Sequence, residues 1–135
     1  MSEEQRPVPI PDPGTAPYWE GTREHRLKLP KCEDCGKVHF YPRSVCPHCG
    51  SARLTWIEAC GRGSVYSFTV VHRPPSPAFK PLVPYVVAVV TLDEGPHLMT
   101  RIGGCSTDDV RIGMPVQVAW EDIDSTATLP YFIPQ

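Results

Sequence analysis

Residues 32–36 read Cys-Glu-Asp-Cys-Gly, and residues 46–50 read Cys-Pro-His-Cys-Gly. Each segment holds two cysteines separated by two residues, with a glycine directly after the second cysteine. Four thiolates arranged in this way form a closed tetrahedral site, for which zinc is the default metal and iron the alternative. The predicted ligands are Cys32, Cys35, Cys46 and Cys49.

We call these two Cys-x-x-Cys-Gly segments hooks. The residues around them complete a predicted zinc ribbon over residues 28–58. Between the hooks, residues 37–43 are expected to form a short hairpin arm. His39 and His48 are further metal ligands on paper, but four cysteines already fill a tetrahedron, so both are expected at the surface. Residues 54–58, Leu-Thr-Trp-Ile-Glu, are typical of a strand leading out of the ribbon.

Length and composition limit the fold to a small, proline-rich protein. The chain of 135 residues has room for a metal module joined to one compact barrel. Its 17 prolines disfavour long helices. No apolar run approaches the ~20 residues needed to span a bilayer, and residues 1–6 are polar rather than signal-like. A cytoplasmic location is therefore expected, where reduced thiols favour metal binding over disulfides.

The charge is small overall but unevenly distributed. The net charge is −2, which disfavours a general nucleic-acid binder. Residues 31–80 carry seven cations against three acids, whereas residues 81–135 carry two cations against seven acids. The basic segment could meet a phosphorylated ligand, although an ordinary fluctuation of surface charge explains it equally well.

The N-terminal region, residues 1–27, is expected to contain an arm and one short helix. Residues 1–16 carry four prolines and few apolar side chains, which is typical of an extended arm. Residues 17–27 place several apolar side chains near one helical face, although Gly21 weakens the pattern. Because such a helix is too short to be stable alone, it must dock on this chain or on another subunit.

Residues 59–135 are expected to be all β. Apolar and β-branched runs with period-two alternation predict five strands, which favour a small Greek-key barrel of the OB type, with an open β-sandwich as the alternative. The chain as a whole is thus mainly β, with a short helix, a ribbon and a five-stranded OB-fold barrel. The predicted strands cover residues 65–72, 86–92, 97–102, 116–121 and 129–133, and residues 108–115 are a helical or turn connection.

The loop over residues 73–84 contains five prolines, which makes it a stiff protrusion. Phe79 and Leu82 are apolar side chains on this stiff loop, and exposed apolar side chains on a rigid loop often mark a binding surface. The alternative is that Phe79 folds back to cap the barrel. The sequence contains no nucleophile elbow, phosphate loop or zinc-protease motif, and the remaining thiols, Cys60 and Cys105, are expected to be buried and structural.

These features together resemble a known prokaryotic family. The segments that carry the resemblance, besides the two cysteine hooks, are Pro-Tyr-Trp-Glu at 17–20, residues 61–67, 70–73, 84–88 and 92–96, and Ile-Gly-Met-Pro-Val at 112–116. They look like proteins that join an N-terminal rubredoxin-like zinc ribbon to a C-terminal OB-fold and associate with acyl-CoA enzymes. The resemblance covers residues 17–133 and its motifs occur in family order.

The resemblance implies a non-catalytic subunit that binds a thiolase-like enzyme, either a thiolase or a retro-aldolase. The two would form a hetero-oligomer such as a heterotetramer. Such a subunit would help to form the acyl-CoA site in lipid, steroid or aromatic acyl-CoA metabolism, with structural zinc and acyl-CoA as its ligands. The helix and the proline-rich loop would supply contacts to the partner. The partner-binding candidates are Tyr18, Trp19, Phe79 and Leu82, and the CoA-phosphate candidates, chosen from charge alone, are Arg43, Arg62, Arg73 and Lys80.

Two other functions are compatible with a ribbon and a barrel. The first is nucleic-acid binding, which both modules serve in other proteins. Against it stand the negative net charge and the shortage of strand aromatics flanked by Lys or Arg. The second is a free-standing redox protein that holds iron in the four-thiolate site, which would be coloured, whereas zinc is spectroscopically silent.

Overall fold

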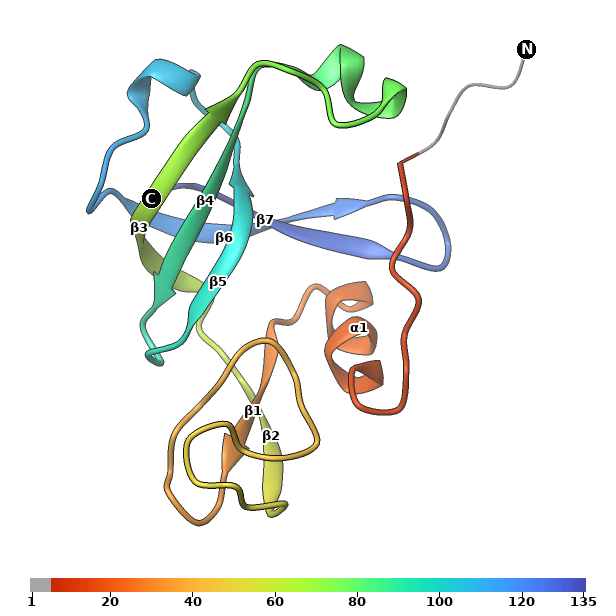
Figure 1. Cartoon of the computed structure of the whole chain (residues 1–135), viewed down its shortest axis with the longest axis vertical. Helices are drawn as coiled ribbons and strands as arrows, with labels where there is room; N and C mark the ends of the chain where they lie inside the picture. Colours follow the sequence, from red (N-terminus) through yellow and green to blue (C-terminus); the bar gives the residue numbers. More distant parts are fainter. Residues whose placement is uncertain (1–5) are drawn as a thin grey trace.

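The computed structural model describes residues 6–135 and contains one helix, a two-stranded ribbon and a closed barrel (Figure 1). Residues 6–12 run along the molecule without regular structure, in keeping with the expected arm, and the part of that prediction covering residues 1–5 lies outside the described residues. Among residues 6–135, no helix has the length and apolar character needed to cross a membrane.

Helix α1 (Ala16–Arg23) begins one residue before the predicted start and ends four residues before the predicted end. The end comes early because His25 has a positive φ of 60° and the amides of Glu24 and Arg26 both bond the Gly21 carbonyl. The chain therefore reverses at His25 and runs directly into the ribbon. Tyr18 and Thr22 are buried on the inner face of the helix.

The ribbon sheet pairs β1 (Lys28–Cys32) with β2 (Leu54–Glu58) in antiparallel register. Strand β2 matches the prediction, whereas β1 was not predicted. The expected hairpin over residues 37–43 is wrong, because Val38 instead forms an isolated bridge with Lys31 of β1. The amides of Cys32 and His39 bond the carbonyls of Lys37 and Pro30, so this segment folds back on β1 and not on itself.

Five strands close into a barrel in the order β3-β4-β5-β7-β6, which confirms the OB-type prediction and excludes the open sandwich. A break in register between Val65 and Ser67 bends the long β3 around the barrel. Strands β4 and β5 form the predicted hairpin. The connections contain two 3-10 helices. The bounds are β3 (Arg62–Val71), η1 (Pro77–Leu82), β4 (Tyr85–Leu92), β5 (His97–Ile102), η2 (Thr107–Asp109), β6 (Pro115–Asp122) and β7 (Thr128–Pro134).

One hydrophobic core joins the helix, the ribbon and the barrel. In β4 every second residue is buried, which follows from the two-residue period of a strand with one face inward. These side chains pack with Phe132 of β7, which is fully buried. The same cluster of buried residues includes Tyr18 of α1 and Leu27 and Leu29 at the ribbon entry. The ribbon is therefore packed against the barrel and is not tethered to it by a free linker.

Candidate metal centre and aromatic cleft

The four predicted ligands converge at the tip of the ribbon. All four Sγ atoms lie within 4.8 Å of one another, with Cys32 to Cys49 at 3.5 Å and Cys35 to Cys46 at 3.7 Å. A tetrahedral zinc site with ordinary Zn–S bonds places its sulfurs roughly 3.8 Å apart. The donor set and its spacing therefore fit one zinc ion, with Cys32 and Cys46 buried and Cys35 and Cys49 exposed.

Backbone amides favour the thiolate form that a metal requires. The amide of Cys35 donates to the Cys32 sulfur at 3.4 Å, and the amide of His48 donates to the Cys46 sulfur at 3.4 Å. The hydrogen bond from Cys35 is the largest cause that lowers the pKa of Cys32 to about 6. Gly36 and Gly50 have φ values of 77° and 81°, a conformation open to glycine at little cost, and this lets each hook turn sharply around the ion.

The two histidines of the ribbon differ in burial. His48 is exposed, as expected, but His39 is only 3% exposed, so the prediction of a surface position for His39 is wrong. Burial follows because the loop between the hooks folds back on β1 and carries His39 beneath it. Neither ring nitrogen of His39 has a hydrogen-bond partner in the described part of the chain.

A second candidate site is an apolar cleft of about 460 Å³ between α1, the ribbon loop and the barrel. Seven of its lining residues are aromatic, although only twelve of the 135 residues are Phe, Tyr or Trp. Clefts with an apolar lining and a few polar groups are the usual form of ligand and partner sites. The lining residues are Arg6, Tyr18, Trp19, Phe40, Tyr41, Phe79, Tyr85, Met99, Arg101, Glu121, Leu129, Pro130 and Tyr131.

Three rings from two segments, helix α1 and the ribbon loop, pack around Tyr18 in this cleft. Its ring centroid lies 4.8 Å from Trp19, 5.5 Å from Phe40 and 6.1 Å from Tyr41. Burial, followed by the nearby Tyr41 hydroxyl, raises the pKa of Tyr18 well above its ordinary value. The phenol rings of Tyr18 and Tyr41 thus lie close together in an apolar wall, and the Tyr18 hydroxyl stays protonated and can donate a hydrogen bond.

The charge on the polar side of the cleft is partly neutralised by one carboxylate. Glu121 lies 2.8 Å from the Arg6 guanidinium and 3.7 Å from that of Arg101. Arg101 also stacks over the Tyr131 ring, 4.5 Å from its centroid. The two cations therefore shape and support the cleft, and their charge is balanced in part by Glu121.

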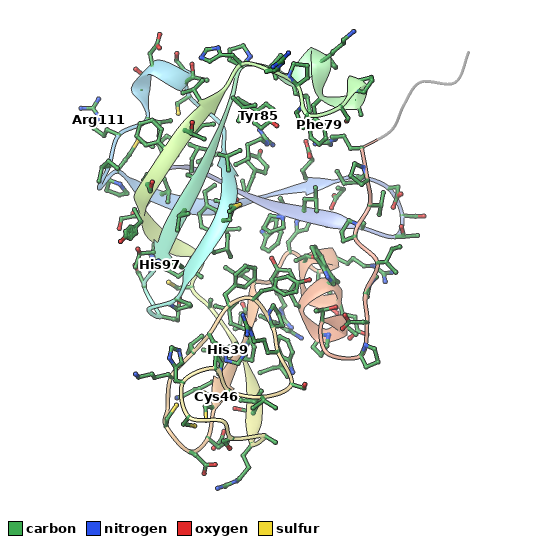
Figure 2. All side chains as sticks on the ribbon, in the orientation of Figure 1. His39, Cys46, Phe79, Tyr85, His97 and Arg111 are labelled. Carbon is green, nitrogen blue, oxygen red and sulfur yellow. The ribbon has the colours of Figure 1, made fainter. Side chains whose placement is uncertain are left out.

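Three of the four predicted partner contacts line this cleft, namely Tyr18, Trp19 and Phe79. Phe79 folds back far enough to place its ring 6.1 Å from Tyr85 and is half-buried, whereas Leu82 on the same loop is 40% exposed (Figure 2). The residues that sequence reasoning missed are Phe40, Tyr41, Tyr85, Met99 and Tyr131. A usable signal was present, because four of the five tyrosines adjoin a proline: Tyr18, Tyr41, Tyr85 and Tyr131.

The four basic residues chosen from charge do not form one site. Arg43 lines a separate cleft between the ribbon and the β4–β5 hairpin. Arg62 begins β3, while Arg73 follows its end and Lys80 lies in η1, at the opposite end of the barrel from the ribbon (Figure 1). A single phosphate group cannot reach all four.

The two remaining thiols differ from expectation in part. Cys60 is exposed and Cys105 is half-buried, so the expected burial of Cys60 is wrong. Cys60 lies in the short link between β2 and β3, where its amide donates to the Glu94 carboxylate at 2.9 Å. This position gives it a structural contact through its backbone and leaves its side chain at the surface.

The fold and the metal geometry define a rubredoxin-like zinc ribbon followed by an OB-fold barrel. Two family models match the chain in this order: the ChsH2 rubredoxin-like zinc ribbon domain over residues 19–55 and the ChsH2 C-terminal OB-fold domain over residues 56–121. The chain belongs to this ChsH2/DUF35 family, which confirms the resemblance seen in the sequence.

Individual relatives match most of the chain. The chain is 42% identical to a chain of the solved "Ltp2-ChsH2(DUF35) aldolase", with a TM-score of 0.83, and the match covers 93% of this chain and 98% of that one. It is 43% identical to the "Probable enoyl-CoA hydratase alpha subunit" of Thermomonospora curvata over 96% of its length, and 33% identical to the "3-oxo-4,17-pregnadiene-20-carboxyl-CoA hydratase alpha subunit" of Mycobacterium tuberculosis over 80%. The matches span 40% and 34% of those two longer proteins.

Proposed function

We propose that this protein is a non-catalytic subunit that binds a thiolase-like enzyme and helps to form its acyl-CoA site. The observation that carries the proposal is the match to a chain of the Ltp2–ChsH2(DUF35) aldolase, which extends over almost the full length of both chains. Two further relatives are named as alpha subunits of CoA-thioester hydratases, which supports a role beside acyl-CoA chemistry.

The partner-binding surface in this proposal consists of Trp19, Phe79 and Leu82. Tyr18, the fourth predicted contact, is only 2% exposed, so it supports this surface from the core and does not form part of it. The apolar area of the surface continues onto Tyr41 and Met99, which are 44% and 72% exposed. Exposed apolar groups gathered around a cleft are a common mark of a protein–protein surface. Aromatic side chains supply much of the binding energy at such surfaces because each covers a large area with few rotatable bonds.

The aromatic cleft beside this surface is proposed to receive the apolar part of the acyl group. Its volume of about 460 Å³ lies within the range of small-molecule sites. The hydroxyls of Tyr18 and Tyr41 would donate hydrogen bonds to an oxygen on that group. This chain contributes binding and orientation, and the reacting groups belong to the partner.

The zinc ion would act as a structural element of this site. Phe40 and Tyr41 lie in the loop between the two cysteine hooks, so a metal held by Cys35 and Cys46 closes the loop that presents both rings to the cleft. Structural zinc binding is coupled to folding in such modules. The metal would therefore fix the position of the loop that carries Phe40 and Tyr41, although it would not itself contact the proposed binding surface.

Co-expression with a thiolase-like enzyme from the same host tests this proposal. Leu82→Asp places a charge in the proposed surface and should weaken the complex by about tenfold or more, since an apolar contact is replaced by a desolvated carboxylate. Ile112→Asp is the matched control, because Ile112 is also exposed, at 65%, and adjoins Arg111 on the opposite side of the barrel from Phe79 (Figure 2). Dissociation constants should change for the first variant alone.

Turnover measurements separate an accessory role from independent catalysis. We expect the isolated chain to leave acyl-CoA thioesters unchanged and to raise the activity of the thiolase-like enzyme when the two are mixed. Hydrolysis or cleavage by the isolated chain would contradict the proposal, as would strong binding to a single-stranded oligonucleotide with a steep salt dependence.

A further inference from the structure

We propose that the cleft between the metal-binding hooks and the β4–β5 hairpin binds a phosphate group. This cleft is distinct from the aromatic one and has a volume of about 630 Å³. It is formed by two segments far apart in sequence, residues 36–48 of the ribbon and residues 94–97 of the barrel hairpin. The inference goes beyond the proposed function, since no argument below depends on an enzyme partner.

The lining of this cleft is rich in hydrogen-bond donors. Lys37 and Arg43 are exposed side chains that take part in no ion pair within residues 6–135. His48 and His97 are exposed on either side of the cleft. Unpaired cations that converge with imidazole donors are the usual protein environment of a phosphate oxygen.

His39 supplies an independent indication of a missing partner. It lines the cleft, is only 3% exposed, and has no hydrogen-bond partner for either ring nitrogen in the described structure. Burial, with repulsion from His48 and Arg43, lowers its pKa. A contact with the Arg43 backbone opposes this shift. A buried donor without a well-placed acceptor is costly, and an anion in the cleft would offset the repulsion and would bond the ring once it turned towards the cleft.

The cleft lining contains one carboxylate, Glu94, which favours an anion that can donate a hydrogen bond. Glu94 is held by the Cys60 amide at 2.9 Å through one oxygen, whereas its other oxygen, Oε1, is buried and unpartnered. Glu94 would repel an anion that offers acceptor oxygens alone. A hydrogen phosphate also carries an O–H, which can donate to Oε1 once the buried Glu94 side chain turns towards the cleft, while the remaining oxygens accept from the exposed side chains of Arg43, Lys37 and His48.

The two walls hold these groups apart and leave room between them. The His97 ring is fixed edge-on against Tyr66, with the ring centroids 4.4 Å apart. Figure 2 places His97 on the barrel hairpin and His39 in the ribbon. Gly36 and Gly95 line the cleft, and a β-carbon at either position would have no heavy atom within 4 Å. The cleft volume of about 630 Å³ leaves room for a ligand between the walls.

Calorimetric titration of the zinc-loaded full chain with inorganic phosphate tests the site. We expect saturable binding of one phosphate, and Arg43→Gln should weaken it by about tenfold, the loss expected for one charge-assisted hydrogen bond. The matched control is Arg111→Gln, an exposed arginine outside the cleft. Zinc content measured on each variant shows whether the ribbon is intact.

Sulfate gives the sharpest comparison, because at neutral pH it has the same shape as phosphate but no proton to donate to Glu94. Phosphate should bind more tightly than sulfate, and Glu94→Gln should reduce that preference. Equal binding of the two anions, an unchanged affinity in Arg43→Gln, or binding of a second zinc ion in place of phosphate would overturn the proposal. Titration with ADP identifies the source of the phosphate group. Tighter binding of ADP than of inorganic phosphate assigns the site to a nucleoside diphosphate, and weaker binding assigns it to the free anion.

Discussion

Gly63 of β3 pairs with both β4 and β6, and no side chain fits at this position. A β-carbon at this position would lie 2.4 Å from the Thr91 carbonyl oxygen and 2.8 Å from Val90 Cγ1. The first of these contacts is with backbone of β4, which cannot move away without breaking the β3–β4 pairing. Gly63 is therefore required by the packing of the barrel.

Gly63→Ala should lower the free energy of unfolding by about 1–3 kcal/mol, the usual cost of overpacking a dense interior. Denaturant unfolding of the zinc-loaded protein measures this change. Gly14→Ala is a suitable control, because its added β-carbon would meet Asp12 Oδ1 at an ordinary 3.4 Å. An unchanged stability for Gly63→Ala would show that β3 and β4 separate more easily than the structure implies.

His39 illustrates what sequence reasoning could not reach at the scale of one residue. A histidine in a polar loop between two metal hooks has no local feature that predicts burial. Its position depends on a hydrogen bond between its own amide and the Pro30 carbonyl, which belongs to the unpredicted strand β1. Cys35 and Cys49, in contrast, were assigned from spacing alone, because a metal constrains nearby ligands directly.

At the scale of elements, α1 is too short to persist alone and is held by contacts on its inner face and just beyond its end. Its inner face contributes Tyr18 to the core. At its end, the His25 ring stacks on Trp120 of β6, and His25 Nε2 lies 3.0 Å from an Asp122 oxygen. Asp122 also accepts a hydrogen bond from the Thr128 hydroxyl at 2.7 Å. These contacts fix the helix against the outer edge of the β6–β7 pair.

The pKa of Asp122 provides a test of this attachment. The Thr128 hydroxyl, followed by His25, holds that pKa below its ordinary value of 3.8. A carboxyl group with a lower pKa in the folded state adds stability above its unfolded pKa, and this contribution is lost as the pH falls through the folded pKa. Asp122→Asn should therefore make stability less dependent on pH below about 4.

Denaturant midpoints between pH 3 and pH 7 measure this effect. Asp108→Asn is the control, since Asp108 is an exposed carboxylate of η2 with no side-chain hydrogen bond among the described contacts. If Asp122→Asn and the parent lost stability equally towards acid, the carboxylate of Asp122 would not anchor the helix.

The missed strand β1 has a physical explanation at the same scale. Its sequence, Lys-Leu-Pro-Lys-Cys, contains a proline, which argues against a strand because it cannot donate to a ladder. In the structure Pro30 lies in a two-stranded sheet, where a missing donor on one side is tolerated. The barrel strands were easier to predict, since alternation such as that of β4 follows directly from one buried face.

At the scale of the whole molecule, the shared core couples the metal to the barrel. Because Leu27 and Leu29 pack in the same cluster as Val90 and Phe132, the ribbon cannot unfold without exposing barrel side chains. Removing zinc, either with a chelator or by Cys46→Ser, should lower the melting temperature of the entire chain. We expect a fall of about 10 °C or more, since structural zinc contributes many kcal/mol and each 1 kcal/mol corresponds to about 2–8 °C.

Differential scanning calorimetry with and without a chelator measures this coupling. The expected result is one transition that moves to lower temperature. A barrel transition that stays at the same temperature while a second, smaller one disappears would show two independent units. Cys105→Ser is the matched control for the thiol substitution, because Cys105 lies outside the metal site.

The sequence by itself determined the metal site and the class of fold, because both depend on short-range spacing. Two cysteines separated by two residues can reach one ion wherever the hook lies, and alternating apolar residues can bury one face in any β barrel. The two clefts were decided by the tertiary structure alone. Their walls come from segments as far apart as Arg6 and Tyr131, or His39 and His97, and only closure of the barrel against the ribbon brings these side chains together.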